Sequence, residues 1–274
     1  MSDTLFTSQV YTPLADRMRA VELDEVFGQE DLTDSKSQLS KMIKARQFKS
    51  CILWGPPGSG KTSFIEDLCY QNKHKYSAAK VWCGTEDSHG SFSKYVKPLF
   101  ISNDYSKQEH ETCILRQKKC KDVCKNRNSI FIMDDCNTER SIFKDKVMLA
   151  QFKNGTRHWA NLFIIGSHYV FDMGPDIRKS VSYVAIFREP SQTERKKLFD
   201  NFAVACSFQE FNDLMDQLTG DYTCLIFNKI GSTNKPEECI FYYKARLHNK
   251  WELGCDEYKK WNEDRYNKKY VEVL

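Results

Sequence analysis

The sequence predicts an α/β fold in which a parallel β-sheet carries helices on both of its faces. Short apolar runs alternate with stretches of helical spacing, and this alternation is typical of parallel sheets. The chain has 274 residues, of which 41% are hydrophobic and 28% are charged, so it can bury a large core. This composition excludes a wholly disordered or collagen-like chain. The expected strands are 51–54, 79–83, 129–133, 161–165 and 181–187.

Helices are expected after the first strand and between the later ones. Residues 62–69 follow a turn rich in Gly and Pro, and they place apolar side chains one helical turn apart. Residues 107–125 have the composition of a polar helix. Residues 191–202 predict a charged helix that begins just after Pro190.

Three regions are expected along the chain. Residues 1–48 predict an N-terminal helical extension, 49–245 the α/β core, and 246–274 a helical tail rich in Lys, Tyr and Trp. The core is expected to end in a C-terminal β-hairpin formed by 223–228 and 240–243.

Net charge, hydropathy and cysteine content indicate in which cellular compartment the protein is expected. The chain has 41 basic and 37 acidic residues, and a net charge of +4 neither requires nor excludes a nucleic-acid partner. No stretch approaches the ~18 apolar residues of a membrane span, and the N-terminus lacks the apolar segment of a secretory signal. The 11 Cys are an odd number in a chain without such a signal. We therefore expect reduced thiols in a soluble intracellular protein.

One local group of residues could be interpreted as a zinc site: His110, Cys113, Cys120 and Cys124. Its spacing lacks the paired Cys-x2-Cys knuckles of structural zinc sites. In the polar helix expected there, Cys120 and Cys124 are simply one turn apart. Buried or half-buried thiols are the expectation, and zinc is the alternative.

The turn after the first strand matches G-x4-G-K-[ST], the phosphate-binding loop, and it lies between an expected strand and an expected helix. Backbone N–H groups of such a loop turn towards phosphate oxygens, and the helix N-terminus adds positive potential. Lys61 is expected to reach the β- and γ-phosphates of ATP, and the Thr62 hydroxyl to ligate Mg²⁺. The expected nucleotide-binding residues are Gly55, Pro56, Pro57, Gly58, Ser59, Gly60, Lys61, Thr62 and Ser63.

Two acids end the strand expected at 129–133. A phosphate loop needs a carboxylate at the end of a neighbouring strand to hold the magnesium ion, and Asp134 has that position. Asp135 can then polarise the attacking water, which is the general-base step of an ATPase. The pair therefore predicts ATP hydrolysis as well as ATP binding.

Further residues are candidates for the hydrolytic step. His168 follows the strand expected at 161–165 and occupies the place of a polar γ-phosphate sensor; a turn cap is the alternative. An arginine from a neighbouring subunit can stabilise the transition state. The candidates are Arg157, Arg178 and Arg188, of which Arg178 is favoured.

Three N-terminal segments look like the opening of clamp-loader-like AAA+ ATPases of the RarA/MgsA type. They are 13–19, 23–29 and 52–62. The similarity stops after the phosphate loop. That family has Glu and then an Ile-His run after its magnesium acid, whereas Asp134 is followed by Asp135 and Cys136.

A longer series of segments resembles the genome-packaging ATPases of large DNA viruses, the poxvirus-type members of the FtsK/HerA superfamily. It runs in the right order through most of the core and therefore outweighs the N-terminal similarity. The chain departs from that family at His168, where a Gln is expected. The segments are 84–87, 98–101, 130–135, 154–158, 167–169, 175–178, 183–188 and 222–225.

The second resemblance implies a P-loop NTPase core of the RecA/ASCE type that hydrolyses ATP to translocate double-stranded DNA. It implies a homo-oligomeric ring that packages a viral genome, with DNA and capsid proteins as partners and no membrane. The location would be the host cytoplasm, at the site of virus assembly, or the virion. One alternative is an AAA+ ATPase that remodels DNA replication intermediates. The other is a nucleotide-gated scaffold without turnover, and the intact Lys61, Thr62, Asp134 and Asp135 argue against it.

Overall fold

The computed structural model describes residues 50–136, 140–168, 173–230 and 233–267, so the N-terminal extension predicted for 1–48 lies outside the described residues. An eight-stranded sheet has the order β3-β2-β4-β5-β1-β6-β7-β8. The first six strands in that order are parallel, whereas β7 is antiparallel to β6 and to β8. The strands are β1 (Ser50–Trp54), β2 (Ala78–Cys83), β3 (Ile101–Ser102), β4 (Ser129–Asp134), β5 (Asn161–Ser167), β6 (Tyr183–Ile186), β7 (Thr223–Asn228) and β8 (Ile240–Lys244).

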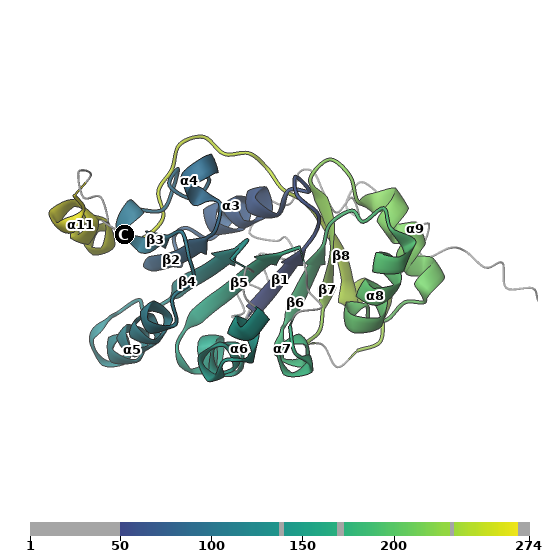
Figure 1. Cartoon of the computed structure of the whole chain (residues 1–274), viewed down its shortest axis with the longest axis horizontal. Coiled ribbons are helices and arrows are strands. Elements are labelled where there is room, and N and C mark those ends of the chain that lie inside the picture. The colour runs from purple at the N-terminus through teal and green to yellow at the C-terminus, as the bar shows by residue number, and fades with distance from the viewer. Residues whose placement is uncertain (1–49, 137–139, 169–172, 231–232, 268–274) are drawn as a thin grey trace, which may run out of the picture.

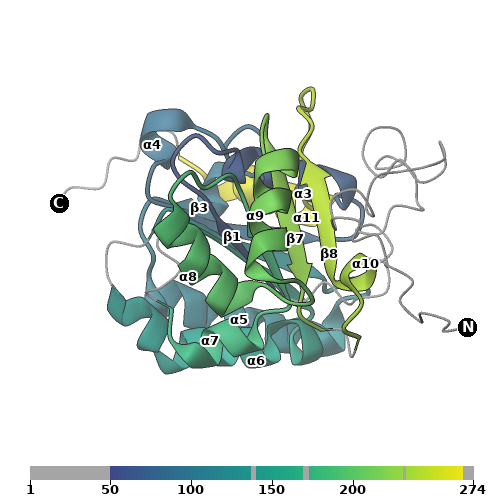
Figure 2. The ribbon, with the colours of Figure 1, turned by 90° about the vertical axis from the view of Figure 1, so that its right-hand side faces the viewer.

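Helices cover both faces of the sheet, which confirms the predicted fold class (Figure 1). Figure 2 views the sheet from its β8 edge, with α3 on one side and α6 and α7 on the other. None of the helices in the described residues is long and apolar enough to cross a membrane. The α-helices are α3 (Lys61–Gln71), α4 (Glu86–His89), α5 (Lys107–Val123), α6 (Lys146–His158), α7 (Pro175–Ser180), α8 (Gln192–Phe202), α9 (Phe208–Leu218), α10 (Pro236–Cys239) and α11 (Asp256–Arg265), and the 3-10 helices are η2 (Pro98–Phe100) and η3 (Arg140–Lys144).

Strand β1 shows why the central strands are continuous apolar runs. Cys51 and Leu53 point into the core under α3, and Ile52 and Trp54 point into the core on the opposite face. All four side chains are buried because helices cover both faces. All five predicted strands and the predicted hairpin of β7 and β8 are present. The two-residue strand β3 and the helix α9 were not predicted.

The segment after β8 packs on the same face as α3. Trp251 stacks on Tyr95 with ring centroids 4.6 Å apart, and Leu253 is fully buried in the same cluster of core residues. The Tyr258 ring stacks on Phe100 at 4.0 Å, and its hydroxyl donates to the backbone of β2. Much of the predicted tail is therefore in contact with the core, while the domain boundary at residue 245 stays a prediction.

Replacing Leu253 by alanine tests whether this segment belongs to the folding unit. We expect Leu253→Ala to lower the free energy of unfolding by about 2–5 kcal/mol, because it leaves a cavity in the core. Leu247→Ala is the matched control, since Leu247 is 86% exposed in the same segment. Urea unfolding of both variants measures the difference, and equal stabilities would show that the segment adds nothing to the core.

His110, from the residues considered for zinc, lies fully buried beneath the sheet. Its Nδ1 lies 2.9 Å from the Tyr105 hydroxyl and its Nε2 lies 3.3 Å from Gln151 Oε1. Cys124 is exposed at the end of α5. In the part of the chain that the structure describes, no group of three or more His, Cys, Asp or Glu is placed to hold a metal ion.

Burial lowers the pKa of His110 from 6.5 to about 4, since the charged imidazolium would lose its hydration. The unfolded chain binds the proton more readily, so stability should fall as pH drops from 6.5 to 4. The expected loss is about 3 kcal/mol. In His110→Gln, which keeps polar groups there but does not titrate, that part of the pH dependence should disappear. Thermal unfolding across this range at constant salt provides the measurement, and identical slopes in both proteins would contradict the assignment.

Candidate active site

The phosphate loop joins the carboxyl end of β1 to the first residue of α3. Gly58 and Gly60 have φ values of +74° and +103°, in the left-handed region that favours glycine. A Cβ on Gly60 would also lie only 2.7 Å from Cδ1 of Tyr222. Tyr222 is 52% exposed and has a φ of +62°, so an unusual backbone conformation holds its ring against the loop.

Lys61 lies inside this loop and is 5% exposed. Its Nζ donates to the carbonyls of Gly55 and Pro56, at 2.8 and 3.3 Å. Burial lowers the pKa of the ammonium, and the nearby Asp135 and Asp134 carboxylates partly offset that effect. The loop's own carbonyl oxygens thus hold the cation at the place where the sequence predicts phosphate contact.

Thr62 and Asp134 meet across the gap between α3 and β4. The hydroxyl of Thr62 donates to Asp134 Oδ2 at 3.0 Å, while Asp134 Oδ1 is buried and has no hydrogen-bond partner. Burial and the adjacent Asp135 raise the pKa of Asp134 to about 6, although Thr62, Lys61 and His168 act in the opposite direction. A cation at this carboxylate would give Oδ1 a partner and would compensate the buried negative charge.

Gly166 provides the space for that carboxylate. It pairs with Asp134 across β4 and β5, and a Cβ at residue 166 would collide with Asp134 Oδ1. On the other side of β4, a Cβ on Gly84 would lie 2.5 Å from the carbonyl oxygen of Asp135. Gly166 on β5 and Gly84 just after β2 therefore flank the acid pair, and neither was predicted as a site residue.

Asp135 follows β4 in a left-handed conformation with φ of +51°. Its Oδ1 lies 3.0 Å from Nε2 of His168, whose Nδ1 lies 2.7 Å from the Gly55 carbonyl oxygen and 3.1 Å from Lys61 Nζ. The imidazole ring thus bridges the phosphate-loop lysine and the second acid. The structure brings together all the site residues predicted from the loop, the acid pair and His168.

The three arginines lie in different places. Arg188 follows β6 at the edge of the sheet that holds the loop, where it donates to the carbonyl of Thr219 at 2.6 Å. Arg178 donates to Asn201, close to the end of α8 that is farther from this edge. Arg157 lies in the last turn of α6, next to the start of β5. Neither Arg178 nor Arg157 joins the phosphate loop of the same chain.

The sequence signal for Tyr222, Gly84 and Gly166 was weak. Each has a role that depends on a neighbour distant in sequence: the ring of Tyr222 contacts Gly60, and the two glycines flank β4. The Gly166-Ser167-His168 run after a strand was the one visible cue, and it was interpreted only through its histidine.

Comparisons with known proteins identify relatives among viruses. No protein-family profile matches the chain. "Uncharacterized protein 088R" of Invertebrate iridescent virus 3 is 36% identical over 210 residues, 75% of this chain and 80% of that protein. "Uncharacterized protein 075L" of Invertebrate iridescent virus 6 is 34% identical over 224 residues, 80% of this chain and 86% of that protein. This chain belongs to the same family as these two iridescent virus proteins.

Solved structures identify the fold of this viral family. The genome packaging NTPase B204 of Sulfolobus turreted icosahedral virus 2, in complex with AMPPCP, aligns with a TM-score of 0.53 at 17% identity. Its complex with ATP-gammaS gives a TM-score of 0.51, and each alignment covers 73% of this chain and 98% of B204. The iridescent virus protein family therefore has a P-loop NTPase fold.

A third similarity is local. Replication-associated recombination protein A of Escherichia coli K12 is 36% identical over 83 residues, which are 30% of this chain and 19% of that protein. The comparisons thus confirm both resemblances, the packaging ATPases through fold and the RarA type through a partial match.

We expect Gly166→Ala to reduce Mg²⁺-dependent ATP hydrolysis about 100-fold, because its methyl group would displace the Asp134 carboxylate and misplaced groups cost about that much in rate. Gly220→Ala is the control, since a Cβ at Gly220 would have no neighbour within 4 Å. Steady-state phosphate release by both variants, with circular dichroism to check folding, measures the effect. Full activity in a folded Gly166→Ala protein would remove Asp134 from the assigned site.

Proposed function

We propose that this protein is an ATP-hydrolysing motor that translocates double-stranded DNA and packages a viral genome into its capsid. One observation carries the proposal: Lys61, Thr62, Asp134, Asp135 and His168 converge at one edge of a sheet. The chain shares the fold of the genome packaging NTPase B204, whose structures contain ATP-gammaS or AMPPCP.

Mg²⁺ fits the residues at this site. The buried Asp134 Oδ1 has no hydrogen-bond partner, and the adjacent Thr62 hydroxyl supplies a second oxygen. Proteins commonly hold Mg²⁺ through one or two side-chain oxygens, with substrate phosphates and water completing the shell. When bound, the ion neutralises charge on the β- and γ-phosphates.

The remaining roles follow from position. Lys61 binds phosphate oxygens after exchanging the Gly55 and Pro56 carbonyls for them. Asp135, whose side chain is 24% exposed, orients water and accepts its proton as the general base. His168 contacts both Lys61 and Asp135, so it positions the base according to what the lysine binds. This is how His168 would act as the γ-phosphate sensor.

The proposed partners are double-stranded DNA, identical subunits in a ring, and capsid proteins. B204 is a packaging NTPase of a virus, and the two iridescent virus relatives are viral proteins, which supports a site of virus assembly in the host cytoplasm or the virion. The partial match to replication-associated recombination protein A favours one alternative, an ATPase that remodels replication intermediates. Long linear duplex DNA is expected to stimulate a packaging motor, whereas forks and single-stranded ends are expected to stimulate an ATPase that remodels replication intermediates.

The catalytic acid provides the first test. We expect Asp135→Asn to bind Mg-ATP almost normally and to hydrolyse it about 10²–10⁴-fold more slowly, the contribution of a general base. Asp134→Asn should instead weaken Mg²⁺ binding, and Lys61→Ala should abolish hydrolysis and weaken ATP binding. Asp176→Asn, an exposed carboxylate on α7, is the control. Calorimetric titration and phosphate release distinguish these effects, and reversed phenotypes of the two acids would exchange their roles.

The ring provides the second test. We expect specific ATPase activity to rise with protein concentration, because an arginine supplied by a neighbour is worth about 10³–10⁵-fold in rate. Mixing Asp135→Asn with Arg178→Ala should restore partial activity, since some interfaces then pair an intact acid with an intact arginine.

The same mixture with Arg188→Ala is the comparison, because Arg188 lies at the phosphate-loop edge. Partial activity in the Arg188→Ala mixture but not in the Arg178→Ala mixture would assign the transition-state arginine to Arg188. Mixtures as inactive as their parents, together with turnover that does not change on dilution, would contradict the ring.

A further inference from the structure

The edge of the sheet opposite the phosphate loop contains two cavities. Parallel strands place the loop and the acid pair at their carboxyl ends, so the opposite edge is formed by the starts of β4, β5 and β6. The antiparallel strand β7 ends at this edge as well. We call this surface the basic edge, defined by Lys121, Lys125, Arg127, Lys153, Arg157, Lys179 and Lys229.

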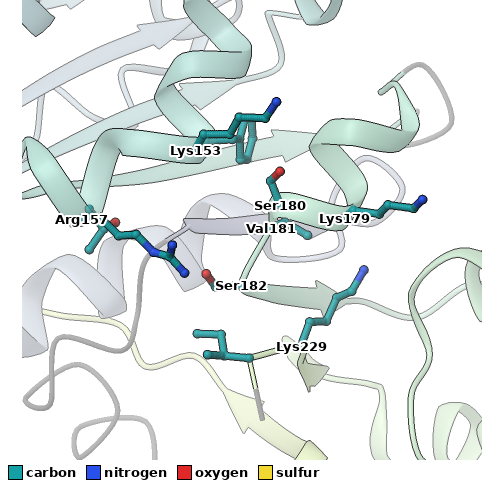
Figure 3. Close-up of a pocket in the computed structure, with 10 residues that line it drawn as sticks. Lys153, Arg157, Lys179, Ser180, Val181, Ser182 and Lys229 are labelled. Atoms are coloured by element: carbon teal, nitrogen blue, oxygen red, sulfur yellow. The ribbon is translucent and has the colours of Figure 1, made fainter. Parts of the chain in front are cut away.

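The first cavity has a volume of about 420 Å³ and lies between α6, α7 and the end of β7. Its cations are Lys153, Arg157, Lys179 and Lys229, and Figure 3 shows Arg157 and Lys229 on either side of Ser182. The other described residues that line it are apolar or carry hydroxyl groups, and none of the described residues that line it is an Asp or Glu.

The second cavity has a volume of about 450 Å³ and lies between the end of α5 and the start of β4. Lys121, Lys125 and Arg127 line it, and the lining residues that the structure describes again include no Asp or Glu. Ala160 also lines it, three residues after Arg157 in the connection from α6 to β5. Residues at or just after the end of α6 therefore line both cavities, which lie on the same edge of the sheet.

Two of these cations lack the charge compensation that buried cations usually have. Lys229 is half-buried and donates to the Arg178 carbonyl at 2.8 Å, and both burial and the nearby Arg178 guanidinium lower its pKa. The Nη1 atom of Arg127 is buried and has no hydrogen-bond partner among the residues that the structure describes. A bound anion would supply the missing charge and the missing acceptor at the two ends of the basic edge.

The length of the basic edge indicates a polyanion rather than a single phosphate. From β4 to β7 the sheet crosses four strand spacings, about 19 Å at ~4.8 Å each. Duplex DNA rises ~3.4 Å per base pair, so the edge spans roughly five to six base pairs. Lys, Arg, Ser, Thr and Asn, the residue types found here, make most contacts to DNA phosphates.

The lining favours a double strand over a single strand. Proteins that bind single strands present aromatic rings on which bases stack. Within the described parts of the chain, Phe152 is the one aromatic side chain that lines either cavity, and it is buried in the core. We propose that the basic edge binds the phosphate backbone of duplex DNA. This inference rests on the proposed function and assigns a DNA-contact surface on the side of the sheet opposite the ATP site.

The test removes three exposed cations: Lys125→Gln, Lys153→Gln and Lys179→Gln combined. The matched control is Lys94→Gln, Lys196→Gln and Lys260→Gln, which removes the same charge from exposed lysines elsewhere. Fluorescence anisotropy with a blunt-ended duplex measures affinity across salt concentrations. We expect the edge variant to bind at least about ten-fold more weakly and to lose about three from the slope of log K against log salt. Its ATPase rate without DNA should equal that of the unmodified protein.

A second measurement needs no substitution. Cys124 is the one exposed thiol among the 11 cysteines, all of which the structure describes, and it lines the second cavity. Saturating duplex should slow its alkylation, while the half-buried Cys255 in the C-terminal segment keeps its rate as an internal reference. Mass spectrometry of the alkylated peptides measures both rates.

The outcomes separate this inference from the proposed function. Equal duplex affinity of the edge and control variants, with Cys124 unprotected, overturns the basic edge and leaves a DNA-stimulated ATPase intact. A protein that hydrolyses ATP but binds no duplex overturns both proposals. Preference for a single strand of equal length overturns the assignment to duplex DNA alone.

Discussion

The register of three parallel strands is the constraint on which the rest of the site depends. Asp134 on β4 pairs with Gly166 on β5, and Ser167 on β5 pairs with Trp54 at the end of β1. These two pairings bring the acid pair, His168 and the phosphate loop to one edge. A slip of one residue would turn Asp134 to the other face of the sheet and place a side chain where Gly166 makes room.

The charges at that edge are balanced for a ligand that carries both signs. Burial raises the pKa of Asp134 and lowers that of Lys61, so each group is held in an environment that disfavours its charged form. Magnesium beside the carboxylate and phosphate beside the ammonium would compensate both charges together. His168 contacts both Lys61 and Asp135, so a ligand that displaces Lys61 also changes the surroundings of Asp135.

The sequence could predict those parts of the site that lie in local motifs. The phosphate loop has a fixed spacing, and Asp134 and Asp135 end an apolar run, so their place at one edge follows from a parallel sheet. Strand β3 was beyond reach because two residues show no periodicity. The burial of Leu253 and the position of Tyr222 arise from contacts between distant segments, which leave no pattern in the local sequence. The basic edge was missed for the same reason, since its cations come from four separate stretches of chain that connect strands of the sheet.

The central place of β1 also has a consequence for synthesis of the chain. This strand is made more than 100 residues before its two neighbours, β5 and β6, because Ser50 pairs with Phe163 and Cys51 with Tyr183. Its phosphate loop further contacts Tyr222. Contacts so distant in sequence form slowly and leave apolar strands exposed until they do. The phosphate loop of a nascent chain therefore gains its contact with Tyr222 only after the segment containing Tyr222 has left the ribosome. The apolar residues of β1 need protection from aggregation until β5 and β6 have been made.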